Sequence, residues 1–517
     1  LRFTSKIRHR ICETQHLVNL FFKQVAGDMC GIIGIIGEQN VVSPIYEGLI
    51  SIQHRGQDAT GIATFDRRFH IKKGHGLVRD VFNEKNITRL QGSIGIGHVR
   101  YPTVGYGTEE DAQPFYASSP FGICMAHNGN VINYFELKDR LFRKNHRHLN
   151  SNCDVEVILN VFADHLSRQM IESLEKDHIF NAVRGVFNDV KGSYSVVAVL
   201  ADIGLVAFRD PHGIKPLVMG KRKAMGAPGG ISYAVASESV VLDLLDFHKT
   251  TNIAPGEVVF IDMNGRVHRK LLVAKEHRLC IFEFVYFARP DSFLDKISVN
   301  KTRTRLGEEL ADQWVRTGLK PDVIIPVPDS ARTAAIAMSS KLGIKYSEGL
   351  VKNRYIGRTF IMPGQDIRKQ SVKRKLNPIQ VDFENNKVLI VDDSIVRGNT
   401  SREIVQIARK SGAREVYFAS YSPPLRFPCV YGIDMSTRGE FIAQKHSVEE
   451  ICHLIGADFL IYQSVEGLIR AARAGNEEID GFCTACFTGQ YPTGDVNASI
   501  LATIEKDRKA AEKELTI

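Results

Sequence analysis

The chain has 517 residues, of which 44% are hydrophobic and 24% charged, the balance of an ordinary globular protein with room for two or three domains. The net charge of +9 is concentrated in residues 1–28, with five Lys or Arg against two acids, and in residues 351–376, with eight against one. The remainder is nearly neutral, which excludes a nucleic-acid-binding face, and no apolar run approaches the ~20 residues that cross a bilayer, which excludes a membrane partner.

The nine cysteines are an odd number scattered over a long chain. This pattern argues against a secreted disulfide framework and favours a reducing compartment. We therefore expect a cytoplasmic location.

Residues 1–29 are expected to be absent from the mature protein. Arg2, Arg8 and Arg10 with an apolar patch at 17–22 would suit a transit peptide, but an upstream extension before a start at Met29 is the preferred interpretation. Met29 before a small residue is readily trimmed by an aminopeptidase. Either route leaves Cys30 as the first residue, with a free amine.

From Cys30 the sequence CGIIGIIG predicts a short apolar strand. Strands and Gly-rich turns then alternate with few long helices; one amphipathic helix is predicted near 135–142. This is typical of packed β-sheets with helices outside. Five short motifs follow in order: HRGQD at 54–58, GHVRYPT at 97–103, AHNGN at 126–130, SNCDVE at 151–156 and RDPHGIKPL at 209–217.

Cys30 and the motifs after it resemble the class II glutamine amidotransferase domain of the N-terminal nucleophile (Ntn) hydrolases, from Cys30 to about Ile261. Taken singly, each of these features is ordinary; a lone Cys before an apolar strand, for example, is usually a core residue. Together they imply an α+β domain with αββα layers over 30–270 that hydrolyses glutamine. The resemblance makes Cys30 the nucleophile and its own α-amine the general base, which is chemically reasonable because an α-amine has a pKa near ~7.7.

The same resemblance assigns the residues around the nucleophile. The Asn128 side chain and the Gly129 N–H would form the oxyanion hole. Arg100 would bind the α-carboxylate of glutamine, and Asp154 would bind its α-ammonium group.

A second half is predicted from 271 to 490, after a linker near 271–278. A strand ending in IIPVPDS at 324–330 brings Ser330 to a turn, where its hydroxyl could meet a pyrophosphate or its metal ion. The basic stretch 352–375, with Lys352 and Arg358, would ordinarily be a solvated face. Between two phosphate-suited loops, it is better interpreted as a lid over pyrophosphate.

The stretch 387–401, KVLIVDDSIVRGNTS, predicts a buried strand, a small polar loop and a helix capped by Thr400 or Ser401. Such a loop suits a phosphate, and two adjacent carboxylates suit a diol or Mg²⁺. An ordinary strand end with solvated aspartates is the alternative. The stretch resembles the phosphoribosyl pyrophosphate (PRPP) loop of type I phosphoribosyltransferases, which implies an α/β domain with a parallel sheet.

That resemblance places Asp392 and Asp393 on the ribose hydroxyls and, with Ser330, on Mg²⁺. The loop residues that it places around the 5-phosphate are Ser394, Arg397, Gly398, Asn399 and Thr400.

Both halves together, from about Met29 to Pro492, resemble the amidophosphoribosyltransferase family, which converts PRPP and glutamine to 5-phosphoribosylamine, pyrophosphate and glutamate at the first committed step of purine synthesis. The resemblance implies a homotetramer or homodimer inhibited by purine nucleotides. The alternative of a different Ntn amidotransferase would require a different kind of second half, without the PRPP-loop stretch. An inactive PRPP-responsive regulator could dispense with Cys30 and would usually add a DNA-binding domain; none is apparent. Residues 491–517 are expected to form a polar tail helix of unknown role.

Cys483 and Cys486 form a CxxC pair that alone could be a zinc half-site, a redox pair or coincidence. One branch of the family carries a [4Fe–4S] cluster on four cysteines. The positions here that match its motifs are Cys280, Cys429, Cys483 and Cys486, so the resemblance implies a structural cluster.

Overall fold

The structure is a computed structural model, and it describes residues 29–101, 109–169, 172–353, 376–433 and 438–502. The predicted leader at 1–28, Pro102 and Thr103 of the GHVRYPT motif, most of the basic stretch with Arg358, and most of the tail lie outside these ranges. Residues 498–502 of the tail are helical.

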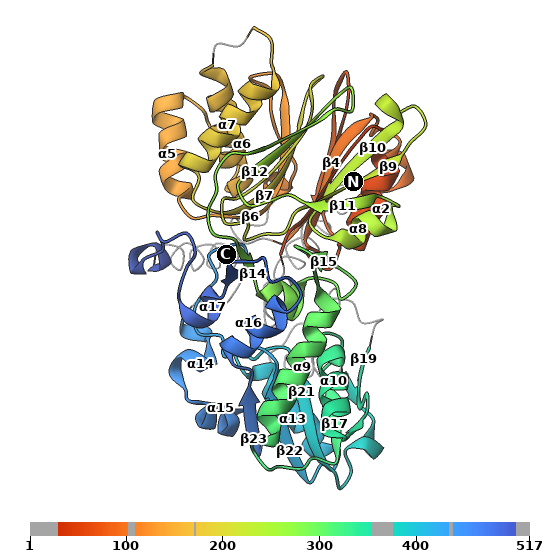
Figure 1. The fold of residues 1–517 in the computed structure, drawn as a ribbon, viewed down its shortest axis with the longest axis vertical. Coiled ribbons are helices and arrows are strands. Elements are labelled where there is room, and N and C mark those ends of the chain that lie inside the picture. The colour runs from red at the N-terminus through yellow and green to blue at the C-terminus, as the bar shows by residue number, and fades with distance from the viewer. Residues whose placement is uncertain (1–28, 102–108, 170–171, 354–375, 434–437, 503–517) are drawn as a thin grey trace, which may run out of the picture.

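The first half of the chain contains two stacked antiparallel sheets (Figure 1). The seven-stranded sheet has the order β11-β9-β10-β1-β4-β2-β3. Its strands are β1 Gly31–Ile36, β2 Ala59–Asp66, β3 Arg68–His75, β4 Ile94–Arg100, β9 Val218–Lys223, β10 Ile231–Ala236 and β11 His248–Asn252. The six-stranded sheet has the order β13-β12-β8-β7-β6-β5. Its strands are β5 Phe115–Ala117, β6 Ile123–Val131, β7 Gly192–Leu200, β8 Gly204–Arg209, β12 Glu257–Asp262 and β13 Val267–Leu271.

Helices cover the outer face of each sheet. The first sheet packs against α2 Val42–Ser51, α3 Val78–Val81 and α8 Ser239–Leu244, with α4 Glu84–Ile87 nearby; the second packs against α5 Tyr134–Asn145, α6 Asp154–Ser167 and α7 Lys176–Asp189. Alternation along β1 explains the layers, because Ile32 lies in the core between the sheets and Ile33 in the core under α2. The predicted αββα arrangement is confirmed.

The second half is built on a parallel sheet of order β18-β17-β21-β22-β23. Its strands are β17 Val323–Pro326, β18 Lys345–Tyr346, β21 Lys387–Asp392, β22 Glu415–Ser420 and β23 Phe459–Tyr462. Its helices are α9 Val299–Val315, α10 Arg332–Leu342, α13 Asn399–Lys410, α14 Ile442–Lys445, α15 Val448–Ile455, α16 Val465–Arg473 and α17 Ala485–Thr488. The apolar run 388–391 is indeed a central buried strand, so the predicted α/β sheet is confirmed.

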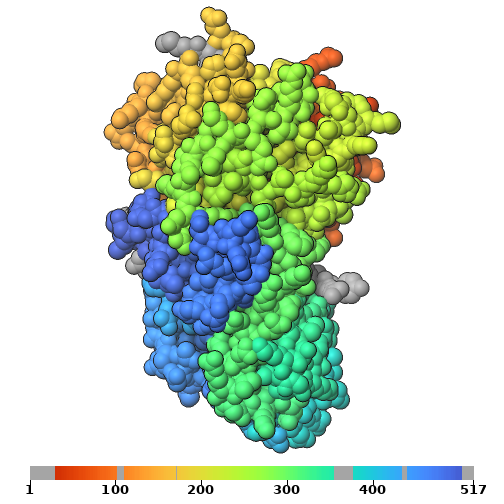
Figure 2. Space-filling view, viewed as in Figure 1, coloured from red at the N-terminus to blue at the C-terminus, as the bar shows by residue number. Residues whose placement is uncertain are grey.

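Segments distant in sequence meet between the two halves. The strand β14, Arg278–Cys280, pairs in parallel with β24, Gly481–Cys483, and a π-helical turn η3 follows at Glu283–Phe287. Two further small sheets are β15 Phe293–Leu294 with β16 Ile297–Ser298, and β19 Leu350–Lys352 with β20 Leu376–Pro378. In the space-filling view the blue C-terminal part lies at the middle of the molecule, against the green part of the first half (Figure 2).

Buried ion pairs also join the halves. The guanidinium of Arg55, on the first half, is fully buried between the carboxylates of Glu238 and Glu283. The Arg209 guanidinium donates to both carboxylate oxygens of Asp295, at 2.9 and 2.7 Å. Bidentate buried pairs fix the orientation of the groups that they join.

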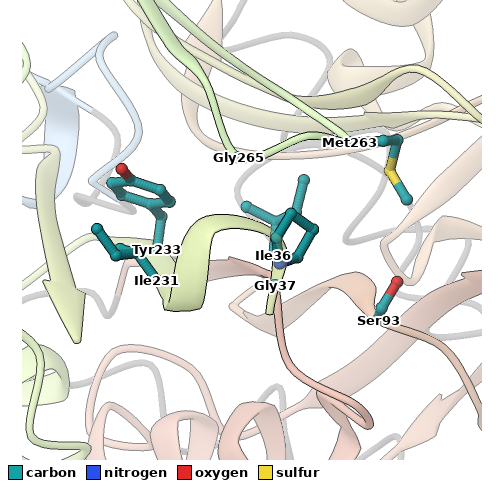
Figure 3. A pocket seen from close by; sticks show the side chains of 8 residues that line it. Ile36, Gly37, Ser93, Ile231, Tyr233, Met263 and Gly265 are labelled. Carbon is teal, nitrogen blue, oxygen red and sulfur yellow. The ribbon is translucent and has the colours of Figure 1, made fainter. Parts of the chain in front are cut away.

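A small pocket lies at the end of β1 that is remote from Cys30 (Figure 3). Its volume is about 40 Å³, and its lining includes Ile36, Ile231, Tyr233 and Met263. The six residues of β1 between Cys30 and this pocket span about 20 Å, so it is separate from the nucleophile. Within the described ranges, every helix is too short or too polar to cross a membrane.

Candidate active sites

Cys30 directly precedes β1, and its side chain is buried. Its thiol faces the carbonyl oxygen of Tyr101 at 3.7 Å. Burial raises the pKa of the Cys30 thiol to about 11, although a backbone hydrogen bond with Tyr101 and the charges of Arg100 and Lys215 oppose this rise. A thiol with this pKa is protonated at neutral pH, so it needs a base to become a nucleophile.

Met29 lies between Cys30 and the second half of the chain. Its side chain is fully buried and packs with Ile214, Leu279 and Cys280. The fully buried ammonium group of Lys215 lies 3.1 Å from the Met29 sulfur. Removal of Met29 would therefore expose the Cys30 amine inside the protein, beside a buried cation.

The strand β6 brings two unusual groups near this position. The Asn128 side chain is fully buried, and neither its Oδ1 nor its Nδ2 has a hydrogen-bond partner in the described part of the chain. Gly129 has a φ of +155°, and a Cβ there would lie 2.0 Å from the Ser193 carbonyl oxygen on β7. A buried amide without a partner requires an explanation, and an absent ligand is one.

Arg100 ends β4 and Asp154 begins α6, and both are buried. The Arg100 guanidinium lies 3.7 Å from the Asp111 carboxylate. The Asp154 carboxylate accepts from the Val131 N–H at 3.0 Å and faces His127 Nε2 at 3.2 Å. Burial opposes ionisation of Asp154, but its electrostatic interaction and hydrogen bond with His127 hold its pKa below the usual value, so it can receive a cation.

His127 was not predicted as part of this site, although it lies in the AHNGN motif. Its Nδ1 accepts from Gln113 Nε2 at 3.2 Å, so its Nε2–H is directed at Asp154. Gln113 also accepts from the His127 backbone N–H at 2.8 Å. Sequence alone gives no signal for Gln113, because its role depends on the pairing of distant segments.

The second site lies at the carboxyl edge of the parallel sheet. Asp392 ends β21 and Asp393 directly follows it, and Ser330 lies in the turn after the neighbouring strand β17. The Ser330 hydroxyl donates to one oxygen of Asp393, and Ser394 donates to the other at 2.6 Å. The structure thus brings together the three predicted magnesium ligands, at the edge where open α/β sheets bind ligands.

Burial makes ionisation of the two aspartates unfavourable. Burial raises the pKa of Asp392 well above its usual range, and the adjacent Asp393 raises it further. Burial also raises the pKa of Asp393, while the Ser330 and Ser394 hydroxyls oppose the rise. An arriving cation would relieve this cost, and two carboxylates with a hydroxyl suit Mg²⁺, which usually retains water and substrate phosphates as further ligands.

The loop after Asp393 leads into α13. The helix begins at Asn399 with Gly398 as its N-cap, at φ +77° and without a side-chain cap, so the predicted cap at Thr400 or Ser401 is wrong. The first amide groups of this 12-residue helix lack a side-chain cap and suit an anion. Asn399 accepts from Arg402 at 3.1 Å, and Arg397 forms an ion pair with Glu440 at 2.5 Å.

Lys352 ends β19, and its ammonium group lies 3.2 Å from Asp329, which also pairs with Arg332 at 2.9 Å. Asp329 directly precedes Ser330. The structure therefore places Lys352 at the rim of the acidic site, while Arg358 lies outside the described residues.

Four buried cysteines form a third site between the halves. Cys280 on β14 is the register partner of Cys483 on β24. The carbonyl of Cys486 accepts from the backbone N–H groups of Arg426 and Phe427, which brings in the segment of Cys429. Burial, then the charge of the neighbouring cysteines, raises the pKa of Cys483 and Cys486; the pKa of Cys280 is raised to about 12. All four are free thiols.

The four cysteines differ from the ligand set of a single metal ion. Among the described residues, no group of three or more His, Cys, Asp or Glu side chains has the spacing to hold one metal ion. The thiolates of a four-iron cluster each bind a different iron, so they stand further apart than the ligands of one ion. Four free, buried thiols that influence one another electrostatically fit the cluster's donor set.

Comparisons with known proteins cover both halves. Residues 98–243 match the glutamine amidotransferase domain family, and residues 294–421 match the phosphoribosyl transferase domain family. Amidophosphoribosyltransferase from Pseudomonas aeruginosa is 50% identical over 94% of this chain and 97% of its own length. The Escherichia coli and Saccharomyces cerevisiae amidophosphoribosyltransferases are 47% and 46% identical, over 94% and 93% of this chain and 98% and 96% of their own lengths.

Two solved structures are similar over most of the chain. The Bacillus subtilis glutamine PRPP amidotransferase, complexed with ADP and GMP, has a TM-score of 0.79 at 38% identity and covers 90% of this chain and 97% of its own. A structure described as the allosteric regulatory enzyme of purine biosynthesis has a TM-score of 0.81 at 36% identity, with coverages of 92% and 99%.

Proposed function

The chain belongs to the amidophosphoribosyltransferase family, and we propose that its two halves divide that family's reaction between Cys30 and the Asp392–Asp393 pair. The enzyme is a pentosyltransferase that converts glutamine and PRPP to 5-phosphoribosylamine, pyrophosphate and glutamate in purine biosynthesis. The observation that best supports the residue assignment is the buried Asn128 carboxamide beside Gly129, which has no hydrogen-bond partner among the residues that the structure describes. The decisive test is the Cys30→Ala variant with glutamine or ammonia as nitrogen source.

In the first half, the α-amine of Cys30 takes the thiol proton and the thiolate attacks the amide carbon of glutamine. The Asn128 Nδ2 and the Gly129 N–H donate to the oxyanion that forms. The α-amine gives that proton to the amide nitrogen, and the intermediate collapses to a thioester and releases ammonia. Water then attacks the thioester carbon, so the C–S bond breaks, glutamate leaves and the thiol is restored. Arg100 and Asp154 bind the α-carboxylate and α-ammonium groups; their burial supports these roles because water does not compete there.

In the second half, Asp392 and Asp393 hold the ribose hydroxyls of PRPP. The 5-phosphate lies against Ser394 and the Arg397–Thr400 segment at the start of α13. Ammonia forms the new bond to C1 of the ribose as pyrophosphate departs with the electrons of the broken bond, near Lys352; Arg358 is proposed as a further PRPP-binding residue. Enzymes of the family use Mg²⁺ with PRPP; held by Asp392, Asp393 and Ser330, it would neutralise charge on the pyrophosphate.

The mature protein is expected to begin at Cys30. The catalytic amine exists only when Met29 and all preceding residues are gone, and the pKa of about 11 for the Cys30 thiol makes a nearby base necessary. Intact-mass measurement of the purified, active protein gives its first residue directly. Glutamine hydrolysis by a protein that retains Met29 would contradict the proposed base.

The four cysteines are proposed to hold a [4Fe–4S] cluster that fastens β14 and β24, with a structural role because the reaction transfers no electrons. Purified protein should be brown, with about four iron atoms per chain. Cys486→Ser should lose iron and visible absorption, whereas Cys452→Ser, a partly exposed thiol outside the group, should retain both. Metal analysis checks this, and a colourless, zinc-loaded protein would contradict it.

The regulation, oligomeric state and cellular location of the protein are proposed from its family. Because the B. subtilis relative was solved with ADP and GMP, we propose feedback inhibition by purine nucleotides, partly at the PRPP site. A homotetramer or homodimer is proposed as well. The eight described cysteines are free, which supports a cytoplasmic location.

A further inference from the structure

A short backbone segment of the second half, Val430–Gly432, lies against the strands β6 and β7 of the first half. The Val430 carbonyl accepts from Asn130 Nδ2 at 2.9 Å, and the Tyr431 carbonyl accepts from Ser193 Oγ at 2.8 Å. Asn130 and Ser193 are register partners on β6 and β7. All four residues are buried, so water does not compete for these hydrogen bonds.

The closest approach is between two glycines. A Cβ on Gly432 would lie 2.7 Å from the carbonyl oxygen of Gly129, 2.8 Å from its carbonyl carbon and 3.0 Å from its Cα. These are backbone atoms that cannot rotate away. On its other side Gly129 is bounded by Ser193, whose carbonyl oxygen would lie 2.0 Å from a Cβ on Gly129. The Gly129 peptide is therefore held between β7 and the second half.

The Val430–Gly432 segment is itself anchored. The Tyr431 hydroxyl hydrogen-bonds the Thr493 hydroxyl at 2.7 Å, and its ring packs against Tyr491 at 6.0 Å between centroids. The Tyr491 hydroxyl donates to the Pro428 carbonyl at 2.8 Å. The segment thus moves with the C-terminal part of the second half and not independently.

We propose that Gly432 and the Val430–Gly432 segment position the Gly129 N–H, so that the oxyanion hole of the first half has its working geometry only when the second half is seated against it. Gly432 touches no substrate and is a positioning residue. The inference rests on the proposed role of Asn128 and Gly129. Its physical basis is that an oxyanion donor acts through preorganisation, and small displacements remove much of its effect.

The test is Gly432→Ala in the full chain, with kcat and KM measured for glutamine and for ammonia. The Cβ must displace Gly129, so we expect kcat with glutamine to fall roughly 10- to 100-fold while the KM for glutamine stays within about two-fold. Ammonia-dependent synthesis should be unchanged. The rate at which iodoacetamide alkylates Cys30, followed on its peptide by mass spectrometry, should also be unchanged. In alkylation the thiolate displaces iodide, and this reaction needs no oxyanion donor.

Gly343→Ala is the matched control. Its φ of +66° imposes similar backbone strain in the same half, but no atom of the described residues, apart from its chain neighbours, lies within 4 Å of the added Cβ. It should retain both activities. Wild-type kcat with glutamine in Gly432→Ala, or an equal loss with ammonia, would overturn the inference.

If Gly432→Ala does not fold, a second variant tests the positioning role of the Val430–Gly432 segment. Ser193→Ala adds no bulk and removes the hydrogen bond to the Tyr431 carbonyl, so a several-fold fall in kcat with glutamine alone is expected; wild-type kcat would overturn the inference. Cys30→Ala, measured alongside, separates the two levels. If it still uses glutamine, the proposed function fails, whereas normal Gly432→Ala and Ser193→Ala enzymes beside an inactive Cys30→Ala would refute only the positioning role.

Discussion

Cys30→Ala is expected to abolish glutamine-dependent synthesis of 5-phosphoribosylamine and to leave ammonia-dependent synthesis near the wild-type rate. Loss of the nucleophile in a comparable covalent mechanism reduces kcat by about 10⁶-fold. Ammonia supplied from solution bypasses that step. The PRPP loop lies on the parallel sheet of the second half, which has its own apolar core around Ile325, Ile390 and Phe418. Removal of one sulfur atom beside β1 should not disturb it.

The measurement compares pyrophosphate release with saturating glutamine and with ammonium chloride at a pH where free ammonia is present. Cys124→Ala is the matched control, because Cys124 is another fully buried thiol of the first half, in the core between the sheets. It should retain both activities. If folded Cys30→Ala protein lost both activities equally, the division of the reaction between the two halves would be untenable.

Much of the fold follows from local pattern. The apolar runs at 324–327 and 388–391, each ending in acids or hydroxyls, correspond to β17 and β21, and the helix predicted near 135–142 is part of α5. The helix cap was missed because the glycine at 398 adopts a left-handed conformation, which the sequence of the loop does not specify. The pairing of β14 with β24 joins residues about 200 positions apart and leaves no local signal.

In the candidate sites too, local motifs predicted some features, whereas others depend on the tertiary fold. Short motifs placed the principal groups, such as Cys30 and Asp393, because strand ends and turns display their side chains together. Their partners depend on tertiary contacts. Arg397 was expected at a phosphate and is paired with Glu440, and Gly129 was expected at an oxyanion and is also pressed against Gly432. No periodicity or spacing along the chain predicts such contacts.

Asp393→Asn is expected to abolish synthesis with glutamine and with ammonia alike, because both routes need PRPP held at the same carboxylates. Asp393 accepts from the Ser330 and Ser394 hydroxyls, so both its oxygens act as acceptors. An amide replaces one acceptor with a donor and removes the charge that the ribose hydroxyls and Mg²⁺ require. Loss of two such interactions predicts at least a roughly 10³-fold fall in kcat/KM for PRPP.

The same substitution should not weaken the fold. The pKa of Asp393 is raised by burial, so its ionised form is less favourable in the folded protein than in the unfolded chain, and that penalty begins once the pH rises above the pKa of the unfolded chain. A neutral Asn removes the penalty together with the repulsion of Asp392. We therefore expect an unchanged or higher Tm, measured by thermal denaturation, beside the lost activity.

Asp382→Asn is the appropriate comparison, because Asp382 is also buried in the second half and accepts from a serine hydroxyl, that of Ser347 at 2.6 Å, outside the PRPP loop. It should retain both activities. Suppose that Asp393→Asn keeps or raises the Tm but loses all synthesis, whereas Asp382→Asn keeps its activity. The acidic pair would then be identified as groups that reduce the stability of the fold and are required to bind PRPP. Survival of either activity in Asp393→Asn would instead remove the ribose-binding role from that carboxylate.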